Sequence, residues 1–344
     1  MQLNTSKAKL ALQSTALSTL RSAGLFSIAK RSARRRQQLL ILCYHGLSMA
    51  DEHEWLPHLF MTPQQFRARL ACLREMNANV LPLEEGLARL WSGSLPETSV
   101  AITFDDGFVD LLHYGVPALA EFGFPATLYL TTHYMNYRLP IVNLVLDYIL
   151  WKSGRETVLL PEYGITSELP IGSYAERQVV VRRLLQTADE AKLDTTAKDE
   201  MARAIAAELG VDYQRILEQR QIQILKPEEV VEAARQNIDV QMHTHRHRAP
   251  SSWDRDTFVQ EIEDNRRAIR DVTNTNPVHF CYPGGDCGSM DVQRWLKESG
   301  VQSGTTCERG LASPEAEPLR LPRVLDDSIM SPPRFESFVS GFFA

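Results

Sequence analysis

Two adjacent carboxylates, Asp105 and Asp106, stand at the end of a short apolar run and directly before Gly107. Two like charges side by side repel each other, and burial makes ionising both of them still less favourable. Such a pair indicates a bound metal, a neighbouring cation or a raised pKa. Taken alone, an Asp-Gly turn with one Asp capping the next helix explains the pattern equally well.

A histidine cluster follows another short apolar run: His243, His245 and His247 are three of the nine histidines in the chain. Two neutral imidazoles and one carboxylate make a three-ligand site with a position left open for water, as in hydrolytic zinc centres. The alternatives are a solvated His-rich loop and a core histidine that binds a backbone carbonyl. The clustering directly after a predicted strand favours the metal site.

A third signal is the turn Pro283-Gly284-Gly285, which follows a predicted strand. Backbone N–H groups exposed in such a turn could stabilise a developing oxyanion. A tight turn between a strand and a helix explains the same residues. His45 likewise follows a predicted strand, either as a catalytic group or as a structural residue at the end of that strand.

Short apolar, β-branched runs alternate with helical patterns, which predicts βαβ units and a parallel sheet, open or closed into a barrel. The predicted strands are 39–44, 99–104, 126–130, 238–243, 278–282, 301–306 and 319–325, and the clearest helices are 63–76, 114–122, 255–272 and 290–299. All the chemically suggestive residues then lie at the C-terminal ends of strands, where α/β barrels assemble active sites.

The rhythm of strands and helices divides the chain into four parts. Residues 39–134 and 237–344 form the two parts of the barrel, and residues 135–236 read as a helical insertion because that stretch is too long for an ordinary crossover. Residues 1–38 form a basic N-terminal segment. We interpret that segment as an amphipathic helix resting on anionic lipid, an organelle-targeting peptide or a disordered tail.

Composition limits the classes of partner. The net charge is −6, although the first 50 residues contain eight Lys and Arg and no acidic residue, so the rest of the chain is acidic and no nucleic-acid partner is expected. No run reaches the roughly 18 apolar residues of a membrane span. Five scattered cysteines form neither a disulfide framework nor a CxxC motif. We expect a cytoplasmic location, and peripheral membrane contact if residues 1–38 form the amphipathic helix.

Together these segments resemble the polysaccharide deacetylase family, also called the NodB-homology or carbohydrate esterase family 4 group. The resemblance covers most of residues 40–328. It rests on Tyr-His-Gly at 44–46, Thr-Phe-Asp-Asp-Gly at 103–107, the pair His243 and His247, Tyr-Pro-Gly-Gly at 282–285 and Leu-Pro-Arg at 321–323.

The resemblance implies a distorted (β/α) barrel with Asp106, His243 and His247 as ligands of a divalent metal ion, Zn²⁺ in the first place. It implies that Asp105 is the base that takes a proton from the attacking water. The backbone N–H near Gly284 would then stabilise the oxyanion together with the metal.

The chain departs from the family pattern at two positions. Many members have an arginine where this chain has Cys281, and a late histidine that protonates the leaving amine. We hypothesise that Arg323, at the end of the last predicted strand, supplies the missing cation beside Asp105. For the missing general acid, His45 is one candidate, and Asp105 returning the proton that it took is the other.

The predicted function is therefore metal-dependent deacetylation of an N-acetylated glycan or a lipid-linked sugar, with hydrolysis of the acetamide C–N bond. An O-acetyl sugar esterase is the nearest alternative, because the same centre would cleave either bond. A catalytically weakened sugar-binding protein of the same fold is the alternative from another class, suggested by the two departures.

Overall fold

Seven parallel strands form a closed barrel in the computed structural model, which describes residues 2–343, with side chains described for residues 12–343 except residue 252. Strand β1 (Leu40–Tyr44) pairs with β5 (Ser99–Asp106) on one side and with β12 (Leu321–Leu325) on the other, which closes the ring. From β12 the order continues through β11 (Ser303–Arg309), β10 (His279–Cys281), β9 (Ile238–Met242) and β6 (Ala126–Leu130), which pairs with β5. The prediction of a distorted (β/α) barrel of about seven parallel strands is confirmed.

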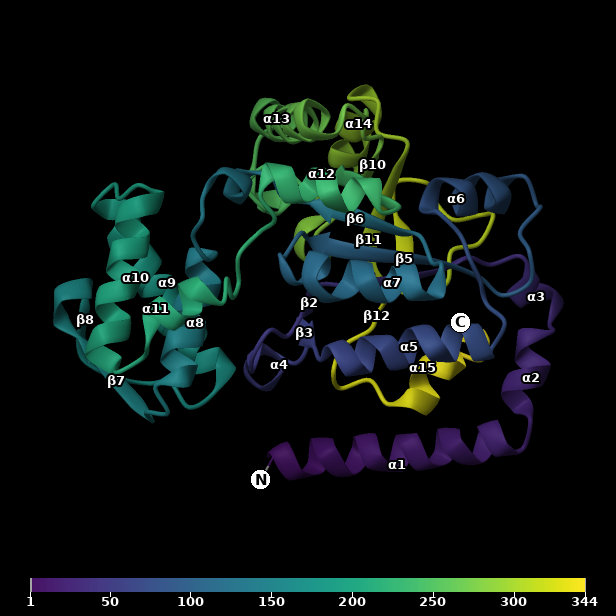
Figure 1. Cartoon of the computed structure of the whole chain (residues 1–344), viewed down its shortest axis with the longest axis horizontal. Helices are drawn as coiled ribbons and strands as arrows, with labels where there is room; N and C mark the ends of the chain where they lie inside the picture. Colours follow the sequence, from purple (N-terminus) through teal and green to yellow (C-terminus); the bar gives the residue numbers. More distant parts are fainter. Residues whose placement is uncertain (1, 344) are drawn as a thin grey trace.

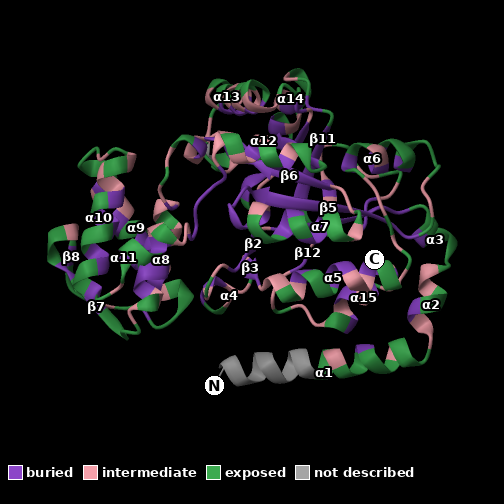
Figure 2. Cartoon of the chain, viewed as in Figure 1, coloured by how far each residue is buried: buried purple, intermediate pink, exposed green. Residues whose placement is uncertain are grey.

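The strands are apolar because both of their faces are covered. Every residue of β1 and β5 is buried, as Figure 2 shows for the centre of the molecule. One face of each strand lines the barrel interior and the other packs under helices, so the strands read as continuous hydrophobic runs. A short strand, β4 (Asn79–Val80), pairs with the first residues of β5.

Helices surround the barrel (Figure 1). Helix α5 (Pro63–Glu75) begins after Thr62, which forms a capping box with Gln65. The other covering helices are α6 (Leu83–Trp91), α7 (Val116–Phe122), α12 (Pro227–Arg235), α13 (Arg255–Thr273), α14 (Met290–Glu298) and α15 (Pro332–Val339). Short helical turns lie at Leu111–Gly115, which is π-helical, and at His133–Asn136, Pro161–Tyr163, Pro250–Ser252 and Pro283–Gly285.

A subdomain leaves the barrel after β6 and lies to one side of it, at the left of Figure 1. Its helices are α8 (Val142–Lys152), α9 (Tyr174–Glu190), α10 (Thr195–Leu209) and α11 (Tyr213–Glu218), with an antiparallel hairpin of β7 (Thr157–Leu160) and β8 (Ile165–Pro170). Helix α12, by contrast, packs against α13 and β9 of the barrel. The subdomain and the barrel share one continuous cluster of buried hydrophobic residues.

Polar contacts also fix this subdomain to the barrel. On the barrel side, these contacts involve the segment between the short paired strands β2 (Gly46–Leu47) and β3 (Phe60–Met61). This segment contains α4 (Glu52–Trp55). The Trp55 indole donates to Asp147 of α8 at 3.1 Å, and the Arg177 guanidinium of α9 pairs with the same carboxylate at 2.6 Å. Asp147 and Arg177 are both buried. The subdomain is therefore held as a fixed wall beside the barrel.

The N-terminal segment is helical, with α1 (Gln2–Ser22), α2 (Leu25–Lys30) and α3 (Ala33–Arg36). Helix α1 packs against α15 below the barrel (Figure 1). Arg35 is buried and donates to the backbone oxygens of Val339, Gln38 and Ser99. One of the basic residues of this segment is therefore a structural tie between the N-terminal helices and the barrel.

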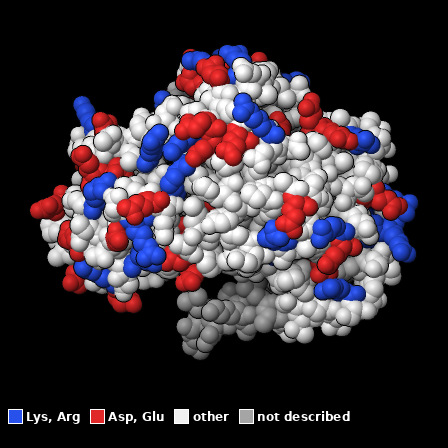
Figure 3. Space-filling model, in the orientation of Figure 1, with Lys and Arg blue, Asp and Glu red and all other residues white. Residues whose placement is uncertain are grey.

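The surface shows no dominant charge on the face seen in Figure 3, where acidic and basic side chains intermingle over the barrel helices and the subdomain. Within residues 2–343, none of the helices is both long enough and apolar enough to cross a bilayer.

Candidate active site

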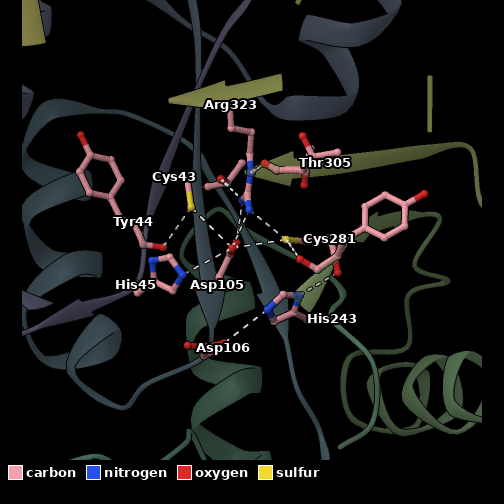
Figure 4. Close-up of polar contacts among 12 residues, drawn as sticks. Cys43, Tyr44, His45, Asp105, Asp106, His243, Cys281, Thr305 and Arg323 are labelled. Carbon is pink, nitrogen blue, oxygen red and sulfur yellow. Dashed lines mark hydrogen bonds and ion pairs between the residues drawn. The ribbon is translucent and has the colours of Figure 1, made fainter. Parts of the chain in front are cut away.

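Strand β5 delivers the two adjacent carboxylates to opposite environments. Successive side chains of a strand point to opposite faces. Asp105 therefore points toward Arg323 of β12, and Asp106 points toward the loop after β9 (Figure 4). Asp106 has a positive φ of 68°, which ends the strand. Gly107 follows with φ 96°, and a Cβ there would lie 2.3 Å from the Leu130 side chain, so this turn requires glycine.

Arg323 holds the Asp105 carboxylate by two parallel hydrogen bonds. Its Nη1 donates to Oδ1 and its Nη2 to Oδ2, each at 2.7 Å. The guanidinium also donates to Thr103 Oγ1 at 3.1 Å and to the Thr306 carbonyl at 3.0 Å. Both charged side chains are buried. This bidentate geometry fixes the orientation of the carboxylate as well as its charge.

The ionisation of Asp105 follows from these contacts. Burial by itself raises the pKa of this carboxyl, but the adjacent Arg323 guanidinium outweighs burial, and the pKa of Asp105 lies well below its usual range. Asp105 is therefore a carboxylate throughout the neutral pH range.

Two thiols complete the surroundings of Asp105. Cys281 Sγ lies 3.3 Å and Cys43 Sγ 3.5 Å from Asp105 Oδ2, and Arg323 Nη2 donates to Cys281 Sγ at 3.0 Å. Burial raises the pKa of both thiols well above the usual value, so they are protonated and act as donors to the carboxylate. Cys281 thus lies where Arg323 and Asp105 meet.

Asp106 faces two imidazoles across a small gap. Its Oδ1 lies 3.4 Å from His243 Nε2 and 3.0 Å from His247 Nε2. The ligand atoms of the three residues all lie within 4.8 Å of one another. Asp106 Oδ1 is a buried oxygen without a hydrogen-bond partner among the described residues. A divalent cation would satisfy this oxygen, and the oxygen and nitrogen donors are those that Zn²⁺ accepts.

The His243 ring is fixed by its second nitrogen. Nδ1 contacts the Cys281 carbonyl at 2.8 Å, which leaves Nε2 to face Asp106. His247 has an exposed side chain, at 42%, so one side of the three-residue group is open to solvent. The residues therefore fit a three-ligand cation site with an open position.

Among the residues whose side chains are described, two other compact groups near the barrel mouth contain metal-ligand residue types, and both include Asp105 and a cysteine. One consists of Cys43, His45 and Asp105, and the other of Asp105, His243 and Cys281. Burial keeps both thiols protonated, and the Arg323 guanidinium already neutralises Asp105. A cation placed there would meet a fixed positive charge, so the Asp106 group is the better site.

Asn265 of α13 positions the histidine loop. Its Oδ1 accepts from the His243 backbone N–H at 2.9 Å, and its Nδ2 donates to the Leu130 carbonyl at 3.0 Å and to Thr132 Oγ1 at 2.9 Å. Asn265 is fully buried and joins the ends of β6 and β9. No motif singles out this residue in the sequence, because its partners are known only from the fold.

His45 and the Gly284 turn border the same site. His45 Nε2 lies 3.8 Å from Asp105 Oδ2, beyond hydrogen-bond distance, and burial lowers the pKa of His45. Gly284 adopts φ 63° in the turn Pro283–Gly285, and a Cβ on Gly284 would meet nothing within 4 Å. His45 therefore lies beside Asp105, and Gly284 lies in the turn that follows β10 at the same mouth of the barrel.

Three other polar residues near these motifs have structural partners instead. Asp110 is buried and accepts from the Leu47 N–H at 2.9 Å. His279 Nδ1 contacts Ser303 Oγ at 2.8 Å, and His245 Nδ1 contacts Thr132 Oγ1 at 2.9 Å.

A parallel α/β barrel with an Asp-Arg pair and an Asp-His-His group at its mouth is an arrangement that suits a hydrolase with a bound divalent ion. A model of polysaccharide deacetylases matches residues 92–304, more than half of the chain. The chain therefore belongs to the polysaccharide deacetylase family. Its members are hydrolases of acetylated carbohydrates and generally depend on a divalent metal.

Solved structures of low sequence identity share the fold. The Streptococcus pyogenes deacetylase PplD in complex with acetate is 18% identical with a TM-score of 0.59, over 88% of this chain and 98% of that one. IcaB from Ammonifex degensii is 14% identical with a TM-score of 0.55, over 88% of this chain and 97% of that one. A de-N-acetylase from Aggregatibacter actinomycetemcomitans is also 14% identical with a TM-score of 0.55, over 88% of this chain and 99% of that one. By sequence, no curated protein matches the chain.

Proposed function

We propose that this chain is a metal-dependent deacetylase that hydrolyses the acetamide C–N bond of N-acetylated sugar units. One observation supports it above all: a buried carboxylate fixed by an arginine lies directly beside a three-residue cation site, both at the barrel mouth. In this assignment the base and the ligand group come from adjacent residues, Asp105 and Asp106.

Asp105 is the base in this mechanism. The carboxylate is ionised and held in one orientation by Arg323, so it can take a proton from the water that attacks the acetyl carbon. Arg323 touches Asp105 and no open space, since it is almost completely buried. Its part is therefore to position the base.

Asp106, His243 and His247 would hold the divalent ion, which we propose to be Zn²⁺. When bound, this ion supplies Lewis-acid polarisation of the acetyl carbonyl and makes the attacking water more acidic. The uneven exposure of the two imidazoles, with His243 buried and His247 open to solvent, leaves the substrate an approach from the His247 side.

The remaining steps need a donor for the oxyanion and a proton for the leaving nitrogen. The backbone N–H of Gly284, in the turn after β10, is our candidate oxyanion donor. His45, beside Asp105, is the candidate that receives the proton that Asp105 took from the water and passes it to the amine as the C–N bond breaks. Asp105 returning its proton is the alternative route.

The bond specificity is tested by acetate release from two sets of substrates, oligomers of N-acetylglucosamine and O-acetylated sugars. We expect release from the N-acetylated set. Release confined to the O-acetylated set would replace our proposal with an esterase. Sugar affinity and bound metal without release from either set would favour the binding protein.

We also propose that residues 1–38 bring the enzyme to an anionic membrane from the cytoplasmic side. Ile28 of α2 is 67% exposed beside Lys30 and Arg31, which supports contact of an apolar residue and basic residues with a lipid surface. The full chain should float with vesicles containing phosphatidylserine, and Ile28→Glu should reduce the bound fraction. Equal flotation of both proteins would overturn this proposal.

A further inference from the structure

A cavity of about 360 Å³ lies between the barrel and the subdomain. The loop after β6 lines it with His133, Tyr134 and Tyr137, the beginning of α10 lines it with Thr195, and the histidine loop lines it with Arg246 and Arg248. A cavity of this size falls in the range of small-ligand sites. None of these six residues has a role in the proposed hydrolysis.

The cavity lies next to the candidate metal site. Arg246 and Arg248 immediately precede and follow His247, so a single loop borders both the cavity and the cation site. A substrate longer than one sugar unit can therefore place its acetyl group at the metal site and a neighbouring group in the cavity.

Three rings make up the wall on the barrel side. The His133 ring contacts those of Tyr134 and Tyr137 at centroid distances of 5.1 and 5.3 Å. The His133 N–H donates to the His245 carbonyl at 2.8 Å, which ties this wall to the histidine loop. Burial lowers the pKa of His133, so this residue is neutral near pH 7. Aromatic faces with a polar edge suit the C–H faces and hydroxyls of a sugar.

One cation in the lining lacks a counter-charge. Arg246 pairs with Glu261 at 3.0 Å, and Lys198 pairs with Asp189 at 2.6 Å. Arg248 makes no ion pair or hydrogen bond within the part of the chain that the structure describes, and its side chain is exposed.

The acidic residues of the lining already have partners. Asp194 caps α10 by accepting from the Ala197 N–H at 2.8 Å, and Asp199 accepts from the Tyr213 hydroxyl. Asp199 also pairs with Arg203 at 3.8 Å, whereas Asp194 keeps its negative charge on the α10 wall. Arg248 is the unpaired cation of the lining and lies close to His133 and Tyr134, so an anion is favoured on that side of the cavity.

The cavity is formed before any ligand binds. The buried Asp147 carboxylate, held by Trp55 and Arg177, fixes the subdomain against the barrel segment that contains α4. This contact joins the two parts of the molecule that supply the cavity walls, which reduces the ordering that a ligand has to impose.

We propose that this cavity binds an anionic group, a phosphate or a carboxylate, on the sugar unit next to the acetylated one. The anion pairs with Arg248 while its sugar packs on His133, Tyr134 and Tyr137. This inference rests on the proposed function, because it assigns the substrate class of that same site: acetylated sugars with an adjoining negative charge.

The test measures binding with disaccharides that contain no acetyl group, so turnover does not enter. Cellobiose, cellobiose 1-phosphate and cellobiouronic acid are titrated calorimetrically into the full-length protein, the variants Arg248→Ala and Arg248→Lys, and a control, Arg89→Ala. Arg89 is a half-exposed arginine of α6, paired with Glu85 and absent from the cavity.

We expect at least one anionic disaccharide to bind wild type about tenfold more tightly than cellobiose, the factor for one hydrogen bond to a charged group. Arg248→Ala should abolish the difference, Arg248→Lys should keep part of it, and Arg89→Ala should keep all of it. The preferred anion then identifies phosphate or carboxylate. Equal binding of all three sugars by wild type, or a preference that survives Arg248→Ala, would overturn the inference. A failure of acetate release leaves this result unaffected, so the two proposals can fail separately.

Discussion

At the scale of single residues, the site depends on how one strand presents two neighbouring carboxylates. Asp105 meets a fixed guanidinium and two protonated thiols, whereas Asp106 meets two imidazoles and has an oxygen without a hydrogen-bond partner. The alternation of side chains along β5 produces this difference. Two residues of the same type therefore lie in different surroundings, which suit Asp105 to the proposed role of base and Asp106 to the proposed role of metal ligand.

Replacement of Arg323 tests the positioning of the base. Arg323→Lys keeps a cation but loses the two parallel hydrogen bonds, so kcat should fall by roughly tenfold, and Arg323→Ala should lower it further. Metal content should stay at the wild-type value, because Arg323 contacts none of the three ligand residues. The control is Arg320→Ala, an exposed arginine that pairs with Glu308. Full activity of Arg323→Ala would contradict the proposal that Arg323 positions the base.

Replacement of His45 separates the two candidates for the general acid. An amine is a poor leaving group unless it is protonated, whereas an alkoxide needs protonation less. His45→Ala should therefore lower kcat on an N-acetylated substrate by roughly 10²-fold or more. The loss on an O-acetylated substrate should be much smaller. Unchanged turnover of the N-acetylated substrate would assign the proton to Asp105.

The candidate site was only partly predictable at this scale. The two carboxylates and the histidine cluster stand out because charged residues follow apolar strands, and Arg323 follows from the position of the last strand. Cys43 and Asn265 could not be found in this way. One reads as an ordinary apolar strand residue and the other as a polar residue on a helix, and their contacts depend on tertiary packing.

At the scale of elements, the turn after β12 is tied to α5 by a buried ion pair. Arg69 Nε contacts the two Asp326 oxygens at 3.2 and 3.0 Å. Burial nevertheless raises the pKa of Asp326 to about 6, because the loss of hydration outweighs the attraction of Arg69. The folded state therefore binds a proton at Asp326 more tightly than the unfolded chain does.

This raised pKa predicts a specific pH dependence of stability. The contribution of Asp326 is fully present below about pH 4, the pKa of an unfolded carboxyl, and is lost as the pH rises through about 6. The free energy of unfolding of wild type minus that of Asp326→Asn should therefore fall by about 2.5 kcal/mol between pH 4 and pH 7. Urea denaturation of both proteins measures it. A difference that stays constant or rises with pH would contradict the assignment.

A second buried pair, Asp147 of α8 with Arg177 of α9, holds two helices of the subdomain together. Arg177→Ala leaves a buried carboxylate without its cation, so we expect a loss of about 3–5 kcal/mol in the free energy of unfolding. The double variant Asp147→Asn with Arg177→Met removes both charges and should recover most of this loss. Denaturant unfolding of both variants measures the effect. A single variant within about 0.5 kcal/mol of wild type would show that the pair does not hold the two helices together.

At the scale of the whole molecule, most of the barrel could be predicted because strands buried on both faces are continuous apolar runs. The elements that escaped prediction are those without such a run. Strand β4 has only two residues, and β7 and β8 form an isolated hairpin at the edge of the subdomain. The closure of the ring between β1 and β5 also depends on pairing between strands that are not consecutive in the chain.

The parallel arrangement of the barrel strands also explains the position of the candidate site. All seven barrel strands are parallel, so their C-terminal ends meet at one mouth, and the charged residues that follow them converge there. The subdomain adds a fixed wall to one side of that mouth. The catalytic groups and the cavity beside Arg248 are therefore products of one architecture.

Metal-dependent hydrolysis with Asp105 as the base predicts linked effects on metal content and acetate release, so both are measured in the same samples. Wild type and Asp105→Asn are compared on N-acetylglucosamine oligomers, each as purified and after chelation followed by Zn²⁺. We predict about one metal ion per chain in both proteins. Wild type should lose activity on chelation and regain it with Zn²⁺, and Asp105→Asn should be about 10²- to 10⁴-fold slower with its metal still bound. Undiminished acetate release by metal-free wild type or by Asp105→Asn would contradict the account.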